Sequence, residues 1–325
     1  MSANVSSFGE LLGVYENFYR QNVKHLQPTS LYEPVRYMMD LPGKKIRPLA
    51  VLYCGNLCGA NHQDTLKAAL GLEYFHNFTL IHDDIMDEAA TRRGHTAVHI
   101  KYGVPSSILA GDVMMIEATK WISEAGKHSD ILDLFLTTSR EICEGQAMDM
   151  DYSRITPSTN EYLEMIKLKT AVLLACAFQI ACTLGNQSTV MCKLFYQLGI
   201  ETGLCFQIKD DWLDLYGDTD LTGKRRGGDI LAGKKNILFL EALAAADSKD
   251  KLRLEFLFSA NCAADLRFAE ATEIYSKYNI KDRVANVESR YSDRIWKLID
   301  EIGSIDPVCS EGIKPFIQLI IERSF

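Results

Sequence analysis

The stretch LKAALGLEYFHNFTLIHDDIMD, residues 66–87, decides the fold class of this chain. Its apolar side chains recur at intervals of three and four residues, which is the period of a packed α-helix. Strand-like alternation is hard to find elsewhere, and no proline lies between Pro157 and Pro307 to interrupt a helix. Similar helical patterns occur at 105–126, 129–152, 159–185 and 188–216. The sequence therefore predicts an all-α protein.

Length and composition are those of a well-packed globular protein. The chain has 325 residues, of which 47% are hydrophobic and 24% charged, and no linker or low-complexity segment divides it. We expect a single domain over residues 1–325, with helices packed around a central cavity. The formal charge of −8 argues against nucleic acid as a partner, because that function usually needs a basic face.

The cysteines and the apolar segments indicate where in the cell the protein is located. The nine cysteines include no CxxC pair, and such scattered cysteines are typical of a reduced intracellular protein. Residues 1–22 show no signal-peptide pattern. The longest apolar stretch, residues 171–184, is shorter than the about 20 residues that span a bilayer. We therefore expect a cytoplasmic protein without a transmembrane segment.

One acidic pattern, Asp-Asp-x-x-Asp, occurs twice. The first motif is Asp83, Asp84 and Asp87, and the second motif is Asp210, Asp211 and Asp214. Carboxylates four residues apart lie on the same face of a helix and repel each other. A hard divalent cation between them would relieve this repulsion, because such ions prefer oxygen ligands. Two helices with this pattern could face each other and enclose metal ions together with a strongly anionic ligand.

Basic segments accompany both acidic motifs. Residues 41–48 contain Lys44 and Arg47 at a turn that leads into a helix, where an anion could bind. Arg92-Arg93-Gly94 follows the first motif, and the glycine-rich segment 217–235 follows the second. That segment is not a P-loop, because its glycine spacing and the residue after its lysine differ from the pattern. Carboxylates beside cations predict a diphosphate bound through magnesium.

At these residues the chain resembles the trans-prenyl diphosphate synthases, the family of farnesyl and geranylgeranyl diphosphate synthases. Any one match is weak evidence, but the whole series, in the family's order, is highly specific. The matching segments are Gly43-Lys44-x-x-Arg47-Pro48, residues 76–87, Arg92-Arg93-Gly94, Lys169-Thr170, Phe206-Gln207-x-x-Asp210-Asp211-x-x-Asp214, Gly223-Lys224 and Lys234. The resemblance implies an isoprenoid-synthase-type helical bundle, a homodimer, and a prenyltransferase that adds isopentenyl diphosphate to an allylic diphosphate.

The resemblance also implies a role for each matching residue. Three Mg²⁺ ions would be held by Asp83, Asp87 and Asp210, with Asp84, Asp211 and Asp214 in nearer or outer-shell support. The allylic diphosphate would contact Arg92, Lys169, Lys224 and Lys234. The Lys169 carbonyl, Thr170 and Gln207 would stabilise the allylic cation. Isopentenyl diphosphate would bind without metal to Gly43, Lys44, Arg47, His76 and Arg93, and the departing diphosphate would remove the proton.

The product and two alternative functions stay open at this point. The resemblance implies that Phe78, with Phe75 and Thr79 beside it, forms the floor of the tail pocket. It therefore implies a short product, geranylgeranyl diphosphate (C20) first and farnesyl diphosphate (C15) second. By helical spacing alone, the two phenylalanines are more typical of a core than of a pocket. A class I terpene cyclase would usually carry an Asn/Ser/Glu pattern in place of the second motif. A non-catalytic regulatory subunit would commonly have lost one motif, and this chain keeps both.

Overall fold

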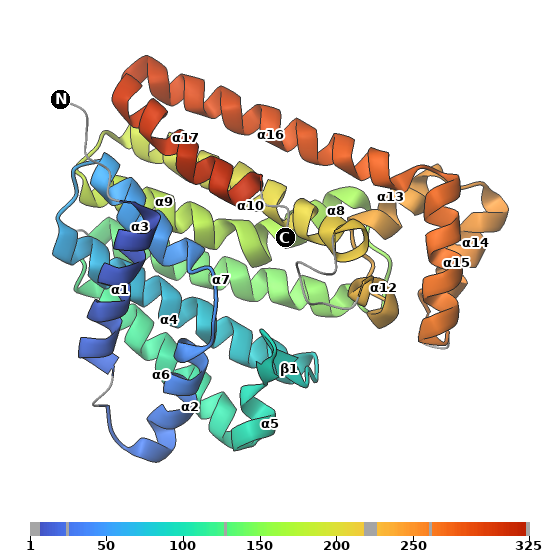
Figure 1. Cartoon of the computed structure of the whole chain (residues 1–325), viewed down its shortest axis with the longest axis horizontal. Coiled ribbons are helices and arrows are strands. Elements are labelled where there is room, and N and C mark those ends of the chain that lie inside the picture. The colour runs from blue at the N-terminus through green and yellow to red at the C-terminus, as the bar shows by residue number, and fades with distance from the viewer. Residues whose placement is uncertain (1–6, 24–25, 127–128, 218–225, 260–261, 323–325) are drawn as a thin grey trace. The chain divides into compact units, whose positions relative to one another are not determined.

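A computed structural model describes residues 7–23, 26–126, 129–217, 226–259 and 262–322, and these are almost entirely helical (Figure 1). The elements up to residue 152 are α1 (Phe8–Val23), α2 (Thr29–Asp40), α3 (Ile46–Leu57), α4 (His62–Met86), β1 (Thr91–Arg92), β2 (His95–Thr96), α5 (Val98–Tyr102), α6 (Val104–Ser123) and α7 (Ser129–Tyr152). The later elements are α8 (Thr159–Ile166), the π-helical turn η1 (Lys167–Ala171), α9 (Val172–Leu184), α10 (Thr189–Tyr216), α12 (Gly228–Ala232), α13 (Ile237–Ala245), α14 (Ser248–Leu257), α15 (Ala264–Lys277), α16 (Ile280–Ile305) and α17 (Pro307–Ile321). The expectation of an all-α fold is confirmed.

The helical patterns in the sequence correspond closely to α4, α6, α7 and α10. The pattern at 159–185 is the exception, because there the chain forms α8, η1 and α9 in succession. A single turn of π-helix hardly changes the spacing of apolar side chains, so periodicity alone could not predict it.

The chain forms two compact units. Unit 1 comprises residues 1–138, 176–196 and 305–313, and unit 2 comprises residues 139–175, 197–304 and 314–325. Helices α7, α9, α10, α16 and α17 contribute residues to both, with Ile305 as the one residue of α16 in unit 1. The first acidic motif therefore lies in unit 1 and the second in unit 2. The single domain expected from the sequence stays a prediction.

Unit 1 is built around α4, which packs against α3 and α6. Gly71 permits a close approach to α6, because a Cβ atom there would lie 3.1 Å from the Ala118 carbonyl oxygen. Tyr74 and Phe75 are fully buried on the same helix. Such close packing holds α4 rigidly, and the first acidic motif lies at its C-terminal end.

A two-residue hairpin follows α4 and carries both arginines of the first basic segment. Strand β1 pairs with β2, with Thr91 opposite Thr96, near the end of α4 (Figure 1). Arg93 and Gly94 have φ angles of 53° and 78°, as the favoured two-residue hairpin turns require. Glycine adopts this conformation freely, whereas Arg93 is held in it by its surroundings.

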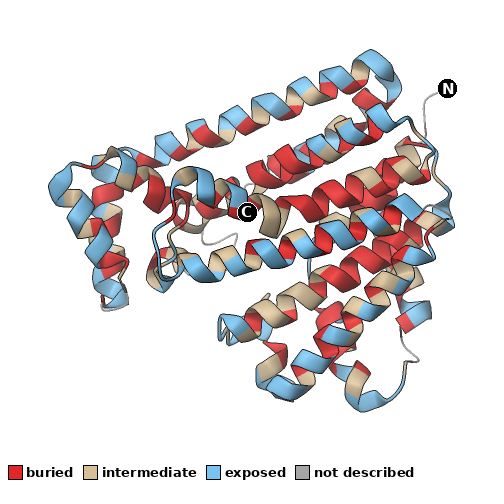
Figure 2. Ribbon diagram, turned by 180° about the vertical axis from the view of Figure 1, so that it is seen from behind, coloured by how far each residue is buried: buried red, intermediate tan, exposed pale blue. Residues whose placement is uncertain are grey.

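Unit 2 contains the long amphipathic helix α16. Its buried side chains recur every three or four residues, as at Val284, Val287, Tyr291 and Ile295, while the opposite face is exposed (Figure 2). This is the pattern of a helix that covers a core on one side and meets solvent on the other.

One helical segment of the described chain is long and apolar enough to span a membrane. It is Thr159–Leu184, which comprises α8, η1 and α9 and has a mean hydropathy of 1.6. It is longer than the apolar stretch recognised in the sequence, since the helix begins well before residue 171. Because 72% of its most apolar window is buried inside the structure, it has the character of a core helix.

Candidate functional site

The first acidic motif presents two of its three carboxylates outward. Asp83 is partly exposed and Asp87 is exposed, whereas Asp84 is only 1% exposed. The Arg92 Nε donates to both Asp84 oxygens, at 2.9 and 3.1 Å, and the Arg92 Nη2 lies 3.7 Å from Asp83 Oδ2. Asp84 therefore holds Arg92, and through it the hairpin, beside the two outward carboxylates.

A basic cluster in unit 1 brings together four residues that the sequence predicted for isopentenyl diphosphate. Arg47 Nη1 donates to His76 Nε2 at 3.1 Å. A Cβ atom on Gly43 would lie 2.8 Å from Arg93 Nη1, so only glycine permits this arginine to come so close. We call Gly43, Arg47, His76 and Arg93 the basic cluster. Lys44, predicted with them, is exposed.

Burial and the surrounding cations keep His76 neutral. Desolvation, followed by the charges of Arg47, Arg93 and Lys45, lowers the pKa of His76 well below its usual value. A neutral imidazole can accept the hydrogen bond from Arg47. Burial also lowers the pKa of Arg47 to about 10, which leaves the guanidinium charged at neutral pH.

The basic cluster contains donors that no described residue satisfies. The Arg47 Nε and the Arg93 Nη1 are buried and have no hydrogen-bond partner within the described part of the chain. Buried donors left without an acceptor are costly. Two such donors on adjoining guanidinium groups indicate a site that is completed by an anion.

A buried glutamate, Glu73, partly balances the charge of the basic cluster and was not recognised as a site residue from the sequence. It is 1% exposed and accepts from Lys45 Nζ at 2.8 Å and from Asn77 Nδ2 at 2.9 Å. Its position was a usable signal, because Glu73 lies on the apolar period of residues 66–87, where a charge needs a partner.

The second acidic motif, in unit 2, also has one buried member. Asp211 is 3% exposed, while Asp210 and Asp214 are partly exposed. Gln207 Nε2 donates to Asp211 Oδ1 at 3.0 Å, and the Tyr162 hydroxyl donates to Asp211 Oδ2. Burial, and next the charge of Asp229, raises the pKa of Asp211 to about 8. A divalent cation bound at the motif would oppose this shift.

The predicted catalytic residues Lys169 and Thr170 lie in η1, and two glycines make room for this π-helical turn. A Cβ atom on Gly145 of α7 would lie 2.4 Å from the Lys169 backbone nitrogen, and one on Gly203 of α10 would lie 2.5 Å from Ala171 Cα. Single π-helical turns occur frequently at functional sites. The Thr170 Oγ1 donates to Gln207 Oε1 at 3.4 Å, so Thr170, Gln207 and Asp211 lie together in unit 2.

Two further aspartates support the predicted lysines, and neither was recognised from the sequence. Lys169 Nζ donates to Asp149 Oδ2 at 2.6 Å. Lys234 Nζ lies 4.0 Å from Asp229 Oδ1, and the Asp229 backbone nitrogen donates to Asp214 Oδ2 at 3.0 Å. Isolated aspartates outside a motif give no signal in a single sequence. Lys224 lies outside the described residues.

The predicted tail-pocket residues form one aromatic group on α4. Phe75 is fully buried between Phe78 and Phe135, with ring centroids 5.5 and 5.3 Å away. Phe78 is partly exposed and packs edge-on against His82, at 4.8 Å. Thr79 is partly exposed beside it. Phe78 and Thr79 can therefore contact a ligand, while Phe75 supports Phe78 from within the core.

The outward carboxylates fit the way in which magnesium binds to proteins. No group of three His, Cys, Asp or Glu side chains suited to a metal ion forms among the residues that the structure describes. Mg²⁺ does not require such a cage, because it usually keeps several waters and binds through one or two carboxylates and the substrate phosphates. Asp83 and Asp87, one helical turn apart, supply such a pair.

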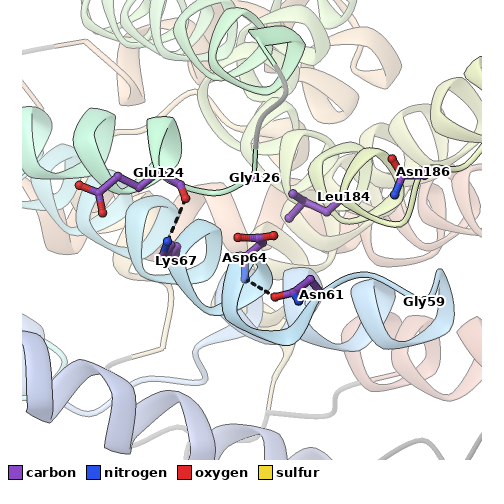
Figure 3. A pocket seen from close by; sticks show the side chains of 8 residues that line it. All are labelled: Gly59, Asn61, Asp64, Lys67, Glu124, Gly126, Leu184 and Asn186. Carbon is purple, nitrogen blue, oxygen red and sulfur yellow. Dashed lines mark hydrogen bonds between the residues drawn. The ribbon is translucent and has the colours of Figure 1, made fainter.

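The pocket drawn in Figure 3 is a different feature. It has a volume of about 700 Å³ and includes Asp64 and Lys67 at the start of α4, Glu124 and Asn186. Lys67 Nζ donates to the Glu124 carbonyl oxygen at 3.1 Å. With a rise of about 1.5 Å per residue, Asp64 lies roughly 28 Å along α4 from Asp83. None of the predicted site residues lines this pocket.

Known proteins match this chain over most of its length. A family model described as polyprenyl synthetase matches residues 28–275. A geranylgeranyl diphosphate synthase of Saccharolobus solfataricus is 33% identical over 315 residues, which are 95% of this chain and 93% of that protein.

Solved structures match the fold equally well. A crystal structure of a geranylgeranyl pyrophosphate synthase has a TM-score of 0.91 and 34% identity, with 98% of this chain and 100% of that chain covered. A polyprenyl synthase from Caulobacter crescentus CB15, complexed with calcium and isoprenyl diphosphate, has a TM-score of 0.86 and 25% identity, with 99% of each chain covered.

Proposed function

This chain belongs to the polyprenyl synthetase family, and we propose that, as a prenyl diphosphate synthase, it adds isopentenyl diphosphate to an allylic diphosphate. The observation that carries the proposal is the pair of anion sites in unit 1. Asp83 and Asp87 offer carboxylates to a metal-bound diphosphate. The basic cluster, with its unsatisfied donors on Arg47 and Arg93, suits a second diphosphate that needs no metal.

The allylic diphosphate is assigned to the acidic motifs. Asp83, Asp87 and Asp210 are the proposed metal ligands, with Asp84, Asp211 and Asp214 in support and three Mg²⁺ ions expected. Bound magnesium supplies the positive charge that makes diphosphate a good leaving group. Arg92, Lys169, Lys224 and Lys234 contact the remaining phosphate oxygens. Arg92, Lys169 and Lys234 are held by Asp84, Asp149 and Asp229, so charge that develops on the leaving group meets cations that are already in place.

The remaining residues hold the two reacting carbons. The Lys169 carbonyl, Thr170 and Gln207 place oxygen atoms beside the allylic cation. The basic cluster and Lys44 hold isopentenyl diphosphate so that its double bond faces that cation, which makes the addition effectively unimolecular. Proton loss to the departing diphosphate completes one elongation, so the reaction requires no nucleophilic side chain.

The tail pocket sets the proposed product. Phe78 and Thr79 are the side chains of the aromatic group that are open to a ligand, and Phe78 would stop the growing tail. We assign geranylgeranyl diphosphate as the main product and farnesyl diphosphate as the second. The geranylgeranyl diphosphate synthase of S. solfataricus, at 33% identity, supports geranylgeranyl diphosphate as the main product.

We also propose an oligomeric state and a cellular location for this protein. Helix α6 exposes Val104, Ile108, Leu109 and Ile116, a row of large apolar side chains that a second copy of the chain could cover. A homodimer accounts for this exposure. The replacement Ile116→Asp is then expected to convert dimers to monomers in size-exclusion chromatography with light scattering. The location assigned is the cytoplasm.

One incubation tests the function. The protein is mixed with isopentenyl diphosphate, magnesium and dimethylallyl, geranyl or farnesyl diphosphate in turn, and the products are dephosphorylated and separated by chromatography. Formation of C20 alcohol supports the proposal. A hydrocarbon product would indicate a terpene cyclase, and absence of elongation with every primer would indicate a regulatory subunit. The basic cluster favours the synthase, because a cyclase does not bind isopentenyl diphosphate.

A further inference from the structure

Tyr162 has an unusual position for a buried tyrosine in unit 2. It lies on α8 and is 5% exposed, and its hydroxyl donates to Asp211 Oδ2. The other oxygen of the same carboxylate, Oδ1, accepts from Gln207 Nε2 at 3.0 Å. Both oxygens of Asp211 are thus engaged by neutral donors, and the carboxylate is buried. This arrangement is that of an anchor, in contrast to the more exposed Asp210.

The anchor determines which end of the Gln207 carboxamide faces Asp211. A carboxamide donates through its NH₂ group and accepts through its oxygen. Gln207 Nε2 lies 3.0 Å from Asp211 Oδ1, so the NH₂ group points toward Asp211. An ionised carboxylate only accepts, and a divalent cation bound at the motif would favour that ionised form. The oxygen is left on the other side, where it accepts from Thr170 Oγ1 at 3.4 Å. The hydrogen-bonded chain therefore runs from Tyr162 through Asp211 and Gln207 to Thr170.

The orientation of this amide matters for the reaction proposed above, on which the inference rests. An allylic cation is stabilised by the partial negative charge of an amide oxygen and destabilised by an NH₂ group in the same place. The two orientations of Gln207 have nearly the same shape, so packing alone discriminates poorly between them. A fixed acceptor behind the amide selects the productive orientation.

We infer that Tyr162 is a positioning residue, which holds the Asp211 carboxylate so that Gln207 presents its oxygen to the allylic cation. Asp211 then acts in the second motif as the acceptor that orients Gln207, and Asp210 carries the metal-binding function. The assignment concerns the hydroxyl of Tyr162. Its ring contributes to the core in the same way as that of any buried tyrosine.

The same unit contains a matched control for the hydroxyl. Tyr275 on α15 is 1% exposed, and its hydroxyl has no hydrogen-bond partner among the described residues. The replacements Tyr162→Phe and Tyr275→Phe each remove one buried oxygen from unit 2. They differ in that only the Tyr162 hydroxyl donates a hydrogen bond to Asp211.

The test compares these variants by kinetics and by calorimetry. For Tyr162→Phe we expect kcat to fall about ten- to a hundredfold, the usual effect of losing a group that orients a site residue. The KM for isopentenyl diphosphate should stay within about twofold, because unit 1 holds that ligand. Titration of inorganic diphosphate in the presence of Mg²⁺ should give nearly the wild-type affinity. Tyr275→Phe should retain wild-type values in all three measurements.

Asp211→Asn is the second variant, for the case in which Tyr162→Phe folds poorly. An asparagine both donates and accepts, so it no longer selects one orientation of Gln207, and kcat should fall while the Mg²⁺-dependent affinity for diphosphate is kept. A parallel loss of kcat and of that affinity in Asp211→Asn would overturn the inference, since it would make Asp211 a direct metal ligand. Wild-type kcat in a folded Tyr162→Phe would also overturn it.

These outcomes are separable from a failure of the proposed function. If the wild-type protein does not elongate any primer, the proposed function itself is wrong. If the wild-type protein elongates and folded Tyr162→Phe is as fast as Tyr275→Phe, only the assignment of Tyr162 is wrong. Thermal unfolding followed by circular dichroism establishes whether each variant is folded.

Discussion

The two copies of Asp-Asp-x-x-Asp are identical in pattern, yet their middle aspartates have different partners. Asp84 on α4 is bound by the cationic Arg92, whereas Asp211 on α10 is bound by the neutral Tyr162 and Gln207. In both motifs the middle carboxylate is buried and the outer two are more exposed. The repeat therefore combines two outward carboxylates, the proposed metal ligands, with one buried carboxylate that has different partners in each copy.

The residues before each motif explain the difference. Gln207 lies four residues before Asp211 and can donate to it along the helix. The corresponding residue before Asp84 is Leu80, which has no donor, so Asp84 is paired by the hairpin arginine instead. The buried aspartate of α4 thus fixes Arg92, which we propose for the leaving group, and that of α10 fixes Gln207, which we propose for the allylic cation.

The largest expected effect comes from removing an outward carboxylate. Asp83→Ala and Asp210→Ala should each lower kcat/KM by about a thousandfold or more, because the charge of the leaving diphosphate is no longer neutralised. Steady-state kinetics with saturating Mg²⁺ measures this, with circular dichroism as the control for folding. Near-normal turnover in either variant would show that the two motifs do not share the metal-binding function.

The anchors themselves should differ in their contribution to stability. Asp84→Ala leaves the Arg92 charge without its buried partner and should lower the free energy of unfolding by about 3 kcal/mol. Asp211→Ala leaves only neutral donors unpaired and should lower the free energy of unfolding by less, about 2 kcal/mol. Urea unfolding of both variants gives the two values. A larger loss for Asp211→Ala would reverse the proposed distinction between a cationic and a neutral anchor.

Much of this comparison could be predicted from the sequence. The features that could not be predicted were missed for physical reasons. The long helices follow from apolar spacing, and the gathering of Gly43, Arg47, His76 and Arg93 follows from family motifs. The partners Tyr162, for Asp211, and Asp149, for Lys169, could not be predicted, because each lies far along the chain from the residue it contacts and outside any motif. The same holds for η1, since its presence depends on close packing against Gly145 and Gly203, which a single sequence does not show.

A further difference between the motifs concerns the proposed floor of the tail pocket, for which α4 supplies Phe78. Phe78→Ala removes the ring that faces a ligand while Phe75 stays buried behind it. The variant should extend its main product by at least one five-carbon unit, with little loss of turnover. Chromatography of the dephosphorylated products measures the length. Phe135→Leu, which alters the core behind Phe75, is the control and should leave the product unchanged.

If Phe78→Ala gives the same product distribution as the wild-type protein, Phe78 is not the floor, and the tail follows another path. A longer product from Phe135→Leu as well would mean that general loosening of the α4 core, and not the position of Phe78, determines chain length. Either result would remove the aromatic floor from the differences between the two copies.

The smallest expected effect is on how the free energy of unfolding depends on pH. It arises from a histidine that only the first motif has nearby. Seven residues before its motif, α4 carries His76, while α10 carries Gly203 at the same distance. The pKa of His76 is lowered in the folded protein by burial and then by Arg47 and Arg93, so the unfolded chain binds a proton more readily. The contribution to stability is complete above the unfolded pKa of about 6.5 and is lost as the pH falls below it, by at most about 1.4 kcal/mol per pH unit.

His76→Gln keeps an acceptor for Arg47 but cannot titrate, so its stability should decrease less between pH 7.5 and pH 5.5 than that of the wild-type protein. Urea midpoints at the two pH values measure the difference, and the other histidines cancel because both proteins contain them. Equal losses in the two proteins would show that His76 is protonated at little cost. The neutral imidazole would then not be what allows the cationic side chains of the basic cluster to lie so close together beside the first motif.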